Sequence, residues 1–262
     1  ALAGGVALNC VANTRLLADG PFREVWVPPA AGDAGTAAGS ALHLARTAGP
    51  AEPMAGADLG PVYPEADIAA ALATFPVRAV RAGRLADEVA EALAGDQIVA
   101  WFQGAAEYGS RALGHRSILA HPGHPANRDR LNLLKGREKF RPIAPAVLVH
   151  RAGDVFGRGP LPSPYMVFVH DVAPQWRARI PAVTHVDATA RVQTVDAARE
   201  PLFAAVIEAF AARTGIPVVA NTSLNVAGGP IVGRPADALE LLCSTRIDLL
   251  AIGPYLVRRD RA

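Results

Sequence analysis

Cysteine, lysine and aromatic residues are all scarce in this 262-residue chain. Its two cysteines, Cys10 and Cys243, are too few for a disulfide framework, and this favours a reducing, cytoplasmic location. Aromatic residues make up 6% of the chain and the formal net charge is +2. A nucleic-acid-binding module would have a broad basic face with stacking aromatic side chains, so nucleic acid is disfavoured as a partner.

Long apolar runs and the common nucleotide-binding motifs are also missing. No apolar segment reaches the roughly 20 residues of a membrane span, and the first residues do not form a signal peptide. The GxGxxG and Walker A patterns do not occur. With 51% hydrophobic and 19% charged residues, the composition predicts a globular protein without a membrane partner.

The apolar periodicity predicts alternating helices and strands. Helices are expected over residues 9–18, 34–45, 65–75, 84–94, 125–134, 200–214 and 237–244. Strands are expected over residues 23–27, 97–103, 143–150, 165–170, 184–193, 216–220 and 249–252. Glycine and proline gather in residues 47–64, which predicts a linker. Because the alternation is irregular, we expect an α/β fold with a mixed sheet and flanking helices.

The segment from Glu107 to His121 is the most informative part of the sequence. It follows an apolar strand and sets Arg111 and Arg116 among glycines and serines. Guanidinium groups donate bidentate hydrogen bonds to phosphate, and glycine lets backbone N–H groups approach an anion. The segment therefore suits a phosphorylated ligand, although surface arginines paired with nearby carboxylates are the competing interpretation.

Three further segments carry polar side chains of the same kind. Residues 135–141 hold both lysines of the chain together with two arginines, Asn221 to Asn225 follows an apolar strand, and Arg191 lies in an alternating segment. Part of residues 135–141 could be a solvated basic face, so we expect Lys135 and Arg141 to face inward. His115, His121 and His124 are expected to be surface or capping residues, because Pro122 interrupts any helix between the last two.

With these segments, Gly4–Asn9 and Trp26–Gly35 make the chain resemble the O-carbamoyltransferases of antibiotic and nodulation-factor biosynthesis. The resemblance implies that residues 1–50 are the end of an actin-like, metal-dependent carbamoyl-transfer domain. Residues 51–85 would be a linker with a helix. Residues 86–262 would be a YrdC-like domain with a mixed, largely antiparallel twisted sheet that forms carbamoyl adenylate.

The resemblance also implies an activity and its partners. Carbamoyl phosphate and ATP with Mg²⁺ would give carbamoyl adenylate, and the carbamoyl group would pass to a hydroxyl of a small-molecule acceptor. An N-terminal part of the same polypeptide would precede residue 1 and supply metal-binding histidines, with iron as the expected divalent metal. A second copy of the chain is a further candidate partner.

Carried over residue by residue, the resemblance implies a set of site residues. The groups implied around the phosphates are Arg111, Lys135, Arg141 and Arg191, with Arg116 as a further binding residue. Asn221 and Ser223 would lie at the carbamoyl or α-phosphate end, and Gly4, Gly5 and Asn9 in the nucleotide pocket of the transfer domain. Asp33 would be one metal ligand, although its position also fits a helix N-cap.

Three alternatives remain open from the sequence. The chain could be similar to threonylcarbamoyl-adenylate synthases that act in tRNA modification, although Gly4–Gly35 argues against this. It could also be a non-catalytic YrdC-like nucleic-acid-binding module, or a fragment that is inert without the rest of its polypeptide.

Overall fold

A computed structural model describes residues 1–46, 49 and 54–259 of the chain. Its central feature is an eight-stranded mixed sheet in the order β1-β11-β10-β2-β3-β9-β4-β8. The pairs β10–β2 and β4–β8 are parallel, and all other neighbours in this sheet are antiparallel. A smaller antiparallel sheet has the order β5-β6-β7. The expected mixed, largely antiparallel sheet is therefore confirmed.

The strands are short, and four of those at the centre of the large sheet, β10, β2, β3 and β4, are buried along their whole length. They are β1 (Val77–Arg81), β2 (Val99–Phe102), β3 (Arg116–Ala120), β4 (Ala144–Leu148), β5 (Phe156–Gly157), β6 (His170–Val172), β7 (Thr189–Ala190), β8 (Gln193–Val195), β9 (Val218–Ser223), β10 (Leu249–Ile252) and β11 (Tyr255–Arg259).

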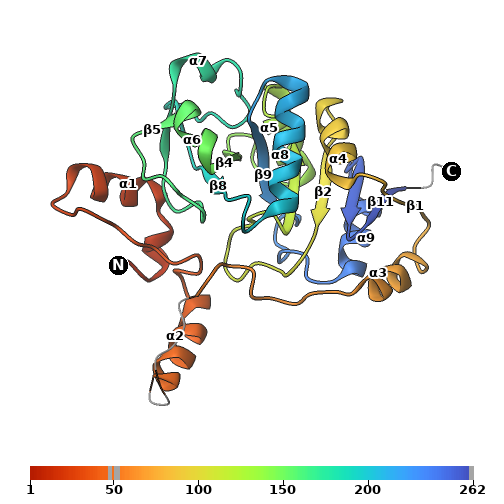
Figure 1. The fold of residues 1–262 in the computed structure, drawn as a ribbon, viewed down its shortest axis with the longest axis horizontal. Helices are drawn as coiled ribbons and strands as arrows, with labels where there is room; N and C mark the ends of the chain where they lie inside the picture. Colours follow the sequence, from red (N-terminus) through yellow and green to blue (C-terminus); the bar gives the residue numbers. More distant parts are fainter. Residues whose placement is uncertain (47–48, 50–53, 260–262) are drawn as a thin grey trace.

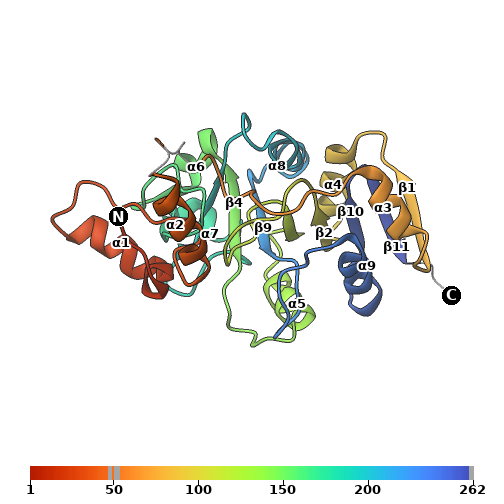
Figure 2. The ribbon, with the colours of Figure 1, turned by 90° about the horizontal axis from the view of Figure 1, so that it is seen from below.

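The described residues form a 3₁₀ helix and several α-helices, some of which cover the two faces of the large sheet. They are the 3₁₀ helix η1 (Gly5–Leu8) and the α-helices α1 (Cys10–Asp19), α2 (Ala34–Ala45), α3 (Glu65–Leu72), α4 (Leu85–Ala94), α5 (Ala126–Leu134), α6 (Val149–Val155), α7 (Pro174–Arg177), α8 (Pro201–Thr214) and α9 (Pro235–Ser244). Helices α4 and α8 pack together on one face, whereas α5 and α9 lie on the other (Figure 2). Trp101 and Phe203, both buried, meet between the sheet and α8 with ring centroids 6.2 Å apart.

The first 46 residues form a separate lobe beside the small sheet (Figure 1). Two side chains of α1 attach it: Asn13 donates a hydrogen bond to the carbonyl of Val167 at 2.9 Å, and Thr14 donates to the carbonyl of Val169 at 2.9 Å. Gly109 rests against Pro29, because a Cβ on Gly109 would lie 2.8 Å from the Pro29 carbonyl oxygen. The neighbouring Tyr108 donates its hydroxyl to the carbonyl of Ala34. The lobe thus contacts the segment that carries Arg111.

Several expected elements differ from those observed. Residues 23–27 form no strand. Among the described residues their backbone makes one backbone–backbone hydrogen bond, from the Leu2 N–H to the Trp26 carbonyl, and a strand needs a partner along its length. The expected strand at 165–170 is reduced to His170, because side chains of α1 take up the polar groups of its backbone. Helix α2 has the expected bounds, and none of its residues is buried.

Four strands, β1, β3, β5 and β11, were not expected. β1 and β11 pair at the edge of the large sheet, so residues 77–81 of the expected linker belong to this sheet. β3 begins directly after the loop that carries Arg111. The strand expected over residues 184–193 is divided into β7 and the start of β8, with Ala188 at a φ of 64° before β7. Residues 47–48 and 50–53 of the expected linker lie outside the described residues.

Within the described ranges, no helix combines the length and the apolar character that crossing a membrane requires.

Candidate anion site

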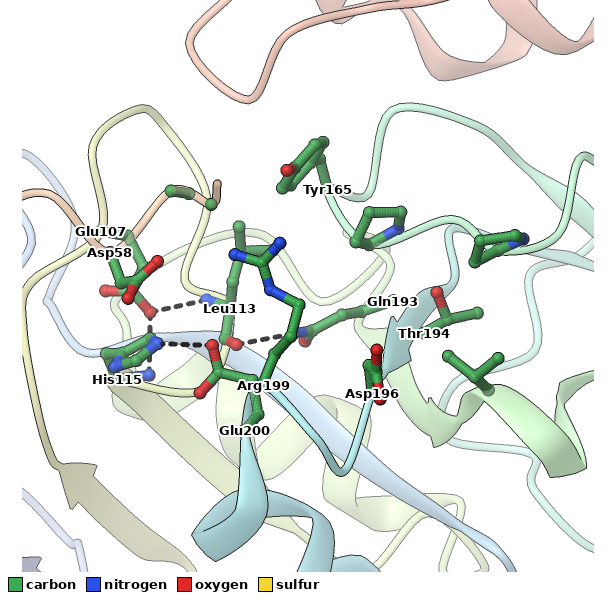
Figure 3. Close-up of a pocket in the computed structure, with 15 residues that line it drawn as sticks. Asp58, Glu107, Leu113, His115, Tyr165, Gln193, Thr194, Asp196, Arg199 and Glu200 are labelled. Atoms are coloured by element: carbon green, nitrogen blue, oxygen red, sulfur yellow. Dashed lines mark hydrogen bonds and ion pairs between the residues drawn. The ribbon is translucent and has the colours of Figure 1, made fainter. Parts of the chain in front are cut away.

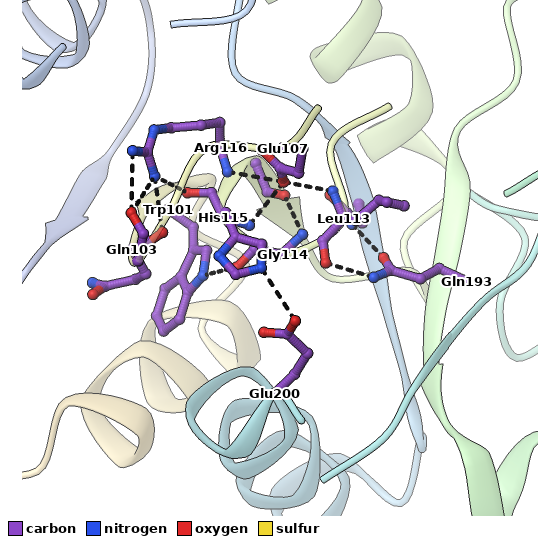
Figure 4. Close-up of polar contacts among 12 residues, drawn as sticks. Trp101, Gln103, Glu107, Leu113, Gly114, His115, Arg116, Gln193 and Glu200 are labelled. Atoms are coloured by element: carbon purple, nitrogen blue, oxygen red, sulfur yellow. Dashed lines mark hydrogen bonds and ion pairs between the residues drawn. The ribbon is translucent and has the colours of Figure 1, made fainter. Parts of the chain in front are cut away.

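The loop from Glu107 to Arg116 is held by one carboxylate and two neighbouring strands. Glu107 Oε1 accepts hydrogen bonds from the backbone N–H groups of Leu113 at 2.6 Å, His115 at 2.9 Å and Arg116 at 3.2 Å (Figure 4). Trp101 of β2 donates its indole N–H to the carbonyl of Gly114 at 2.7 Å. These bonds fix the backbone on which Arg111 is displayed.

Arg116 is part of this support. Its side chain is 0% exposed, and the guanidinium donates to the carbonyls of Gln103 at 2.8 Å and Gly104 at 3.2 Å. It also stacks 3.6 Å above the ring centre of Phe102. Its Nη1 and Nη2 groups donate to backbone carbonyls, and its Nε is buried without an acceptor among the described residues. Arg116 does not line the cavity described next, so its predicted binding role stays a prediction.

A cavity of about 370 Å³ lies beside this loop, and we call it the cationic cavity. Its lining residues come from the loop, from the segment after α5, from the approach to β8 and from β9. They are Ser110, Arg111, Ala112, Arg137, Phe140, Arg141, Pro142, Met166, Arg191, Asn221, Thr222 and Ser223. Four are arginines and none is acidic. The structure therefore brings together the predicted residues Arg111, Arg141, Arg191, Asn221 and Ser223.

Two of the arginines lack partners. The Nε atoms of Arg111 and Arg191 are buried, and neither has a hydrogen-bond acceptor among the residues that the structure describes. Burial and the nearby charges of Arg111 and Arg137 lower the pKa of Arg191 to about 10, and burial lowers the pKa of Arg111. Both remain cations at neutral pH. Cations that are largely removed from water are normally paired, so these two partly buried guanidinium groups are suited to receive an anion.

Lys135 lies in an adjoining cavity of about 620 Å³ that shares Arg137, Arg141 and Ser223 with the cationic cavity. Its ammonium donates to Asn225 Oδ1 at 2.6 Å and to Ser223 Oγ at 3.1 Å, and it is 3% exposed. Lys135 therefore faces inward, as predicted. Burial and the charge of Arg137 lower its pKa to about 7.

Arg141 differs from the prediction in its degree of exposure. The side chain of Arg141 is half exposed and pairs with Glu138 at 2.7 Å, although it lines both cavities. Arg137 also lines both cavities, and its Nε donates to Asn132 Oδ1 at 2.6 Å. The sequence left Arg137 undecided because charge density alone does not distinguish inward from solvated side chains.

A third cavity, of about 280 Å³, lies on the other side of residues 112–114, and we call it the acidic cavity (Figure 3). Its charged lining residues are Asp58, Glu107, Asp196, Arg199, Glu200 and His115. His115 Nε2 contacts Glu200 Oε1 at 3.2 Å. Burial opposes the charged imidazole, but the hydrogen bond and charge of Glu200 outweigh it and raise the pKa of His115.

The histidines are less exposed than expected. His115 is 9% and His121 8% exposed, so neither is a surface residue. His121 Nδ1 accepts the backbone N–H of Gly123 at 3.0 Å in a local turn, but it does not cap α5, whose N-cap position is Pro125. His124 is exposed.

The residues predicted for the carbamoyl-transfer domain lie in the N-terminal lobe, outside both cavities. Gly4 and Gly5 precede or begin η1, and Asn9 is the N-cap of α1, where its side chain accepts the N–H of Ala12 at 3.1 Å. Asp33 is at the N-cap position of α2 and makes no side-chain cap bond. In the described part of the chain, no group of three or more His, Cys, Asp or Glu residues could hold a metal. The residues present therefore do not form the implied metal centre.

Two residues of the site were not identified from the sequence. Gln193 is 3% exposed and donates to the carbonyl of Leu113 at 2.6 Å, and Glu107 organises the arginine loop. Gln193 lies in an alternating segment, which indicates a strand but not which polar residue is buried. Glu107 bonds to backbone groups, and a sequence pattern does not reveal such contacts.

Comparison with known proteins identifies the family. The family described as Carbamoyltransferase C-terminus matches residues 90–259, and Carbamoyltransferase N-terminus matches residues 1–42. Two solved structures overlap with this chain in part. Full-length HypF in a phosphate- and nucleotide-bound form has a TM-score of 0.45 and 19% identity, and the match covers 70% of this chain and 22% of HypF. P. abyssi Sua5 complexed with L-threonine has a TM-score of 0.45 and 14% identity, and the match covers 64% of this chain and 46% of Sua5. Likeness at this level carries no functional conclusion.

Similar sequences match nearly the whole chain. Nodulation protein NolNO of Sinorhizobium fredii is 40% identical over 275 residues, which are 100% of this chain and 40% of that protein. The 3'-hydroxymethylcephem-O-carbamoyltransferase of Amycolatopsis lactamdurans is 40% identical over 245 residues, which are 94% of this chain and 46% of that protein. The chain thus spans less than half the length of these relatives. It belongs to the carbamoyltransferase family.

Proposed function

We propose that the cationic cavity binds the phosphates of carbamoyl phosphate and ATP, and that the chain carries the adenylate-forming half of an ATP-dependent O-carbamoyltransferase. The observation that carries the proposal is that the Nε atoms of Arg111 and Arg191 are buried without an acceptor among the described residues, in a cavity whose lining has no carboxylate. A structural ion pair would place an acidic residue there. A cavity lined by four arginines is instead suited to a ligand with several negative charges.

The positive charge of the cationic cavity would offset the electrostatic repulsion between the two substrates, which is the main barrier to the reaction. Two phosphorylated substrates repel each other, and two unit charges 4 Å apart interact by ~4 kcal/mol at an effective dielectric constant of ~20. Arg111, Arg137, Arg141 and Arg191 would neutralise this repulsion when the substrates bind. The same guanidinium groups would stabilise charge that develops on the phosphoryl oxygens in the transition state.

The proposed step has a defined balance. Carbamoyl phosphate and water give carbamate and inorganic phosphate, and a carbamate oxygen then attacks the α-phosphorus of ATP. The bond to the β-phosphate breaks, so the products are carbamoyl adenylate and pyrophosphate. Carbamate is a poor nucleophile, so holding it in line with the α-phosphorus would contribute to the rate. Ser223 lines the cationic cavity and the adjoining cavity that contains Lys135, and it is suited to orient these groups rather than to act as a nucleophile.

Mg²⁺ would enter as a complex with ATP. None of the residues lining the cationic cavity has a carboxylate, which is the side chain that Mg²⁺ prefers, so the triphosphate itself would hold the ion. The ion supplies further charge neutralisation when it is bound.

Transfer to an acceptor would need the remainder of the polypeptide. The relatives include a cephem O-carbamoyltransferase and nodulation proteins, which supports a hydroxyl of a secondary metabolite as the acceptor. Carbamoyl adenylate hydrolyses readily, so a neighbouring transfer domain would protect it. We place the reaction in the cytoplasm, where ATP is available and the free thiols of Cys10 and Cys243 stay reduced.

The test is pyrophosphate release by the purified chain with ATP and Mg²⁺, with and without carbamoyl phosphate. We expect release that depends on carbamoyl phosphate, and we expect Arg111→Ala and Lys135→Ala to reduce it by roughly a hundredfold or more without unfolding the chain. Titration with each substrate accompanies the assay. A folded chain that binds neither carbamoyl phosphate nor ATP would contradict the proposal.

A further inference from the structure

The ring of Phe140 lies at the edge of the cationic cavity, in the segment that also supplies Arg137 and Arg141. Phe140 is 80% exposed, more than any other phenylalanine among the described residues, and no other aromatic ring there stacks on it. A single exposed apolar side chain is common on protein surfaces and by itself indicates no site. What distinguishes Phe140 is that it belongs to the walls of two cavities.

The second of these is a cavity of about 170 Å³, which we call the rim cavity. It shares Phe140 and Pro142 with the cationic cavity, and both of these residues are exposed. Arg128 of α5 and side chains from residues 182–187 form most of its remaining wall. The two cavities therefore meet at the ring of Phe140, with the arginines on one side and a more apolar wall on the other.

The rim cavity also approaches the cationic cavity at His185. Burial lowers the pKa of this imidazole, the charge of Asp187 opposes the shift, and the positive charge of Arg191 adds to it. Arg191 lines the cationic cavity, so its guanidinium is close enough to His185 for its charge to act there. The two cavities thus adjoin at two places, and a ligand that fills the first can extend past Phe140 into the second.

A nucleoside triphosphate has two unlike parts that match these two walls. Its phosphates are polyanionic, and guanidinium groups donate hydrogen bonds to them. Its base is planar, and proteins that bind single-stranded nucleic acids hold the faces of such bases by stacking them on aromatic side chains. Of the described residues that line the cationic cavity, Phe140 alone is aromatic. Its exposed face is therefore the surface on which a base can stack while the phosphates contact the arginines.

We propose that Phe140 stacks on the base of the nucleotide whose phosphates occupy the cationic cavity, and that the base extends into the rim cavity. The inference rests on the proposed function and deepens it, because it assigns a separate contact to the nucleoside. The guanidinium groups bind any phosphate chain, whereas the ring contributes only when the ligand carries a planar base. Phe140 thus lets the site select a nucleotide over inorganic polyphosphate.

The experiment compares ATP with inorganic tripolyphosphate, which has three phosphates and no nucleoside. Dissociation constants of both are measured by calorimetric titration of the 262-residue chain with Mg²⁺ present. We expect Phe140→Ala to weaken the binding of ATP about tenfold and to leave that of tripolyphosphate unchanged, because only ATP loses a stacking contact. Phe140→Leu should lose most of the same factor, since leucine is apolar but has no aromatic face.

The matched control is Phe22→Ala. Phe22 is 53% exposed, lies in the N-terminal lobe and lines neither the cationic nor the rim cavity, so both affinities are expected to stay at their wild-type values. Because both phenylalanines are exposed, these substitutions should leave the fold intact. Phe140→Trp gives an independent readout, since tryptophan keeps the aromatic face. We expect this variant to retain its ATP affinity, and we expect ATP but not tripolyphosphate to quench the fluorescence of the added indole.

The outcomes separate the two proposals. Unchanged ATP affinity in Phe140→Ala overturns the stacking inference and leaves phosphate binding by the arginines intact. Equal losses for ATP and tripolyphosphate in that variant also overturn it, because they would mean that Phe140 shapes the segment of Arg137 and Arg141 and does not contact the base. Failure of the folded wild-type chain to bind either ligand overturns the proposed function, and the inference with it.

Discussion

The cationic and acidic cavities lie on opposite sides of the same short segment, residues 112–114, yet their charges differ. Ala112 lines the first and Leu113 the second, because successive residues of an extended segment face opposite ways. The cationic cavity has four arginines and no carboxylate, whereas the acidic cavity has four carboxylates and Arg199. The two cavities therefore differ both in the number of their arginines and in the carboxylates beside them, and the anion site lies where no lining residue is acidic.

The largest expected effect tests this difference directly. Arg111→Ala removes an unpaired guanidinium from the cationic cavity, and we expect it to weaken the binding of inorganic phosphate by roughly a hundredfold, or about 3 kcal/mol. The matched control is Arg199→Ala in the acidic cavity, which is expected to leave phosphate affinity unchanged. Calorimetric titration of both variants measures the effect. Equal losses in the two variants would mean that phosphate responds to the overall charge of this region and not to one cavity.

The segment between the cavities is the next target. Gly114 has a φ of 107°, and a Cβ there would lie 2.5 Å from Phe203 Cδ1. We expect Gly114→Ala to lower the free energy of unfolding by about 2 kcal/mol, measured by denaturant titration. The control is Gly153→Ala in α6, where a Cβ has open space. This change is expected to be neutral or slightly stabilising. A Gly114→Ala variant as stable as the wild type would show that α8 is not tightly packed against this segment.

Lys135 adds a charge that changes near neutral pH. With a pKa lowered to about 7, its ammonium is charged below pH 7 and loses its proton as the pH rises. We expect sulfate affinity to fall about tenfold between pH 6 and pH 8, because sulfate keeps its charge over this range and the arginines keep theirs. A Lys135→Met variant should bind more weakly at pH 6 and show a flat profile. A falling profile in that variant would assign the titration to another group.

The smallest effect concerns the acidic cavity. The pKa of His115 is raised in the folded chain, so its pairing with Glu200 stabilises the fold below the pKa of an unfolded histidine. This stabilisation is lost as the pH rises through the folded pKa. Glu200→Gln should therefore lower the free energy of unfolding by about 1 kcal/mol at pH 5.5 and by less at pH 8.5. An equal loss at both pH values would indicate that Glu200 acts through packing alone.

The sequence predicted several elements closely and missed others, with buried and exposed elements in both groups: the exposed α2 has the predicted bounds, whereas the buried β3 was not expected. The bounds of β10 agree with the prediction, and α5 and α8 agree within a residue, with Gly215 after α8 as a clear helix end. The strand expected at residues 23–27 failed because pairing, and not propensity, determines a strand. β1 and β11 were not identified because they lie at the edge of the sheet and carry charged residues on an exposed face.

The site was predicted in part for a similar reason. Glycine, serine and arginine together indicated the loop of Arg111, and the structure brings Arg111, Arg191 and Asn221 to one cavity. Arg116 has the same sequence setting but points to backbone carbonyls, and only the register of β3 against β2 reveals this. The hydrogen bonds of Gln193 with the Leu113 carbonyl and the Asn221 side chain could not be predicted, since they join groups that are distant in sequence.

The contact of Gly109 with Pro29 has a consequence for how this family can be recombined. These residues fall in the two separately matched regions, 90–259 and 1–42. Gly109 is two residues before Arg111, so the backbone that carries the arginine rests on a carbonyl from the other region. A chimaera that exchanges residues 1–42 for those of a relative would therefore replace a wall of the arginine loop. The two regions are therefore better kept together in a chimaera than exchanged separately.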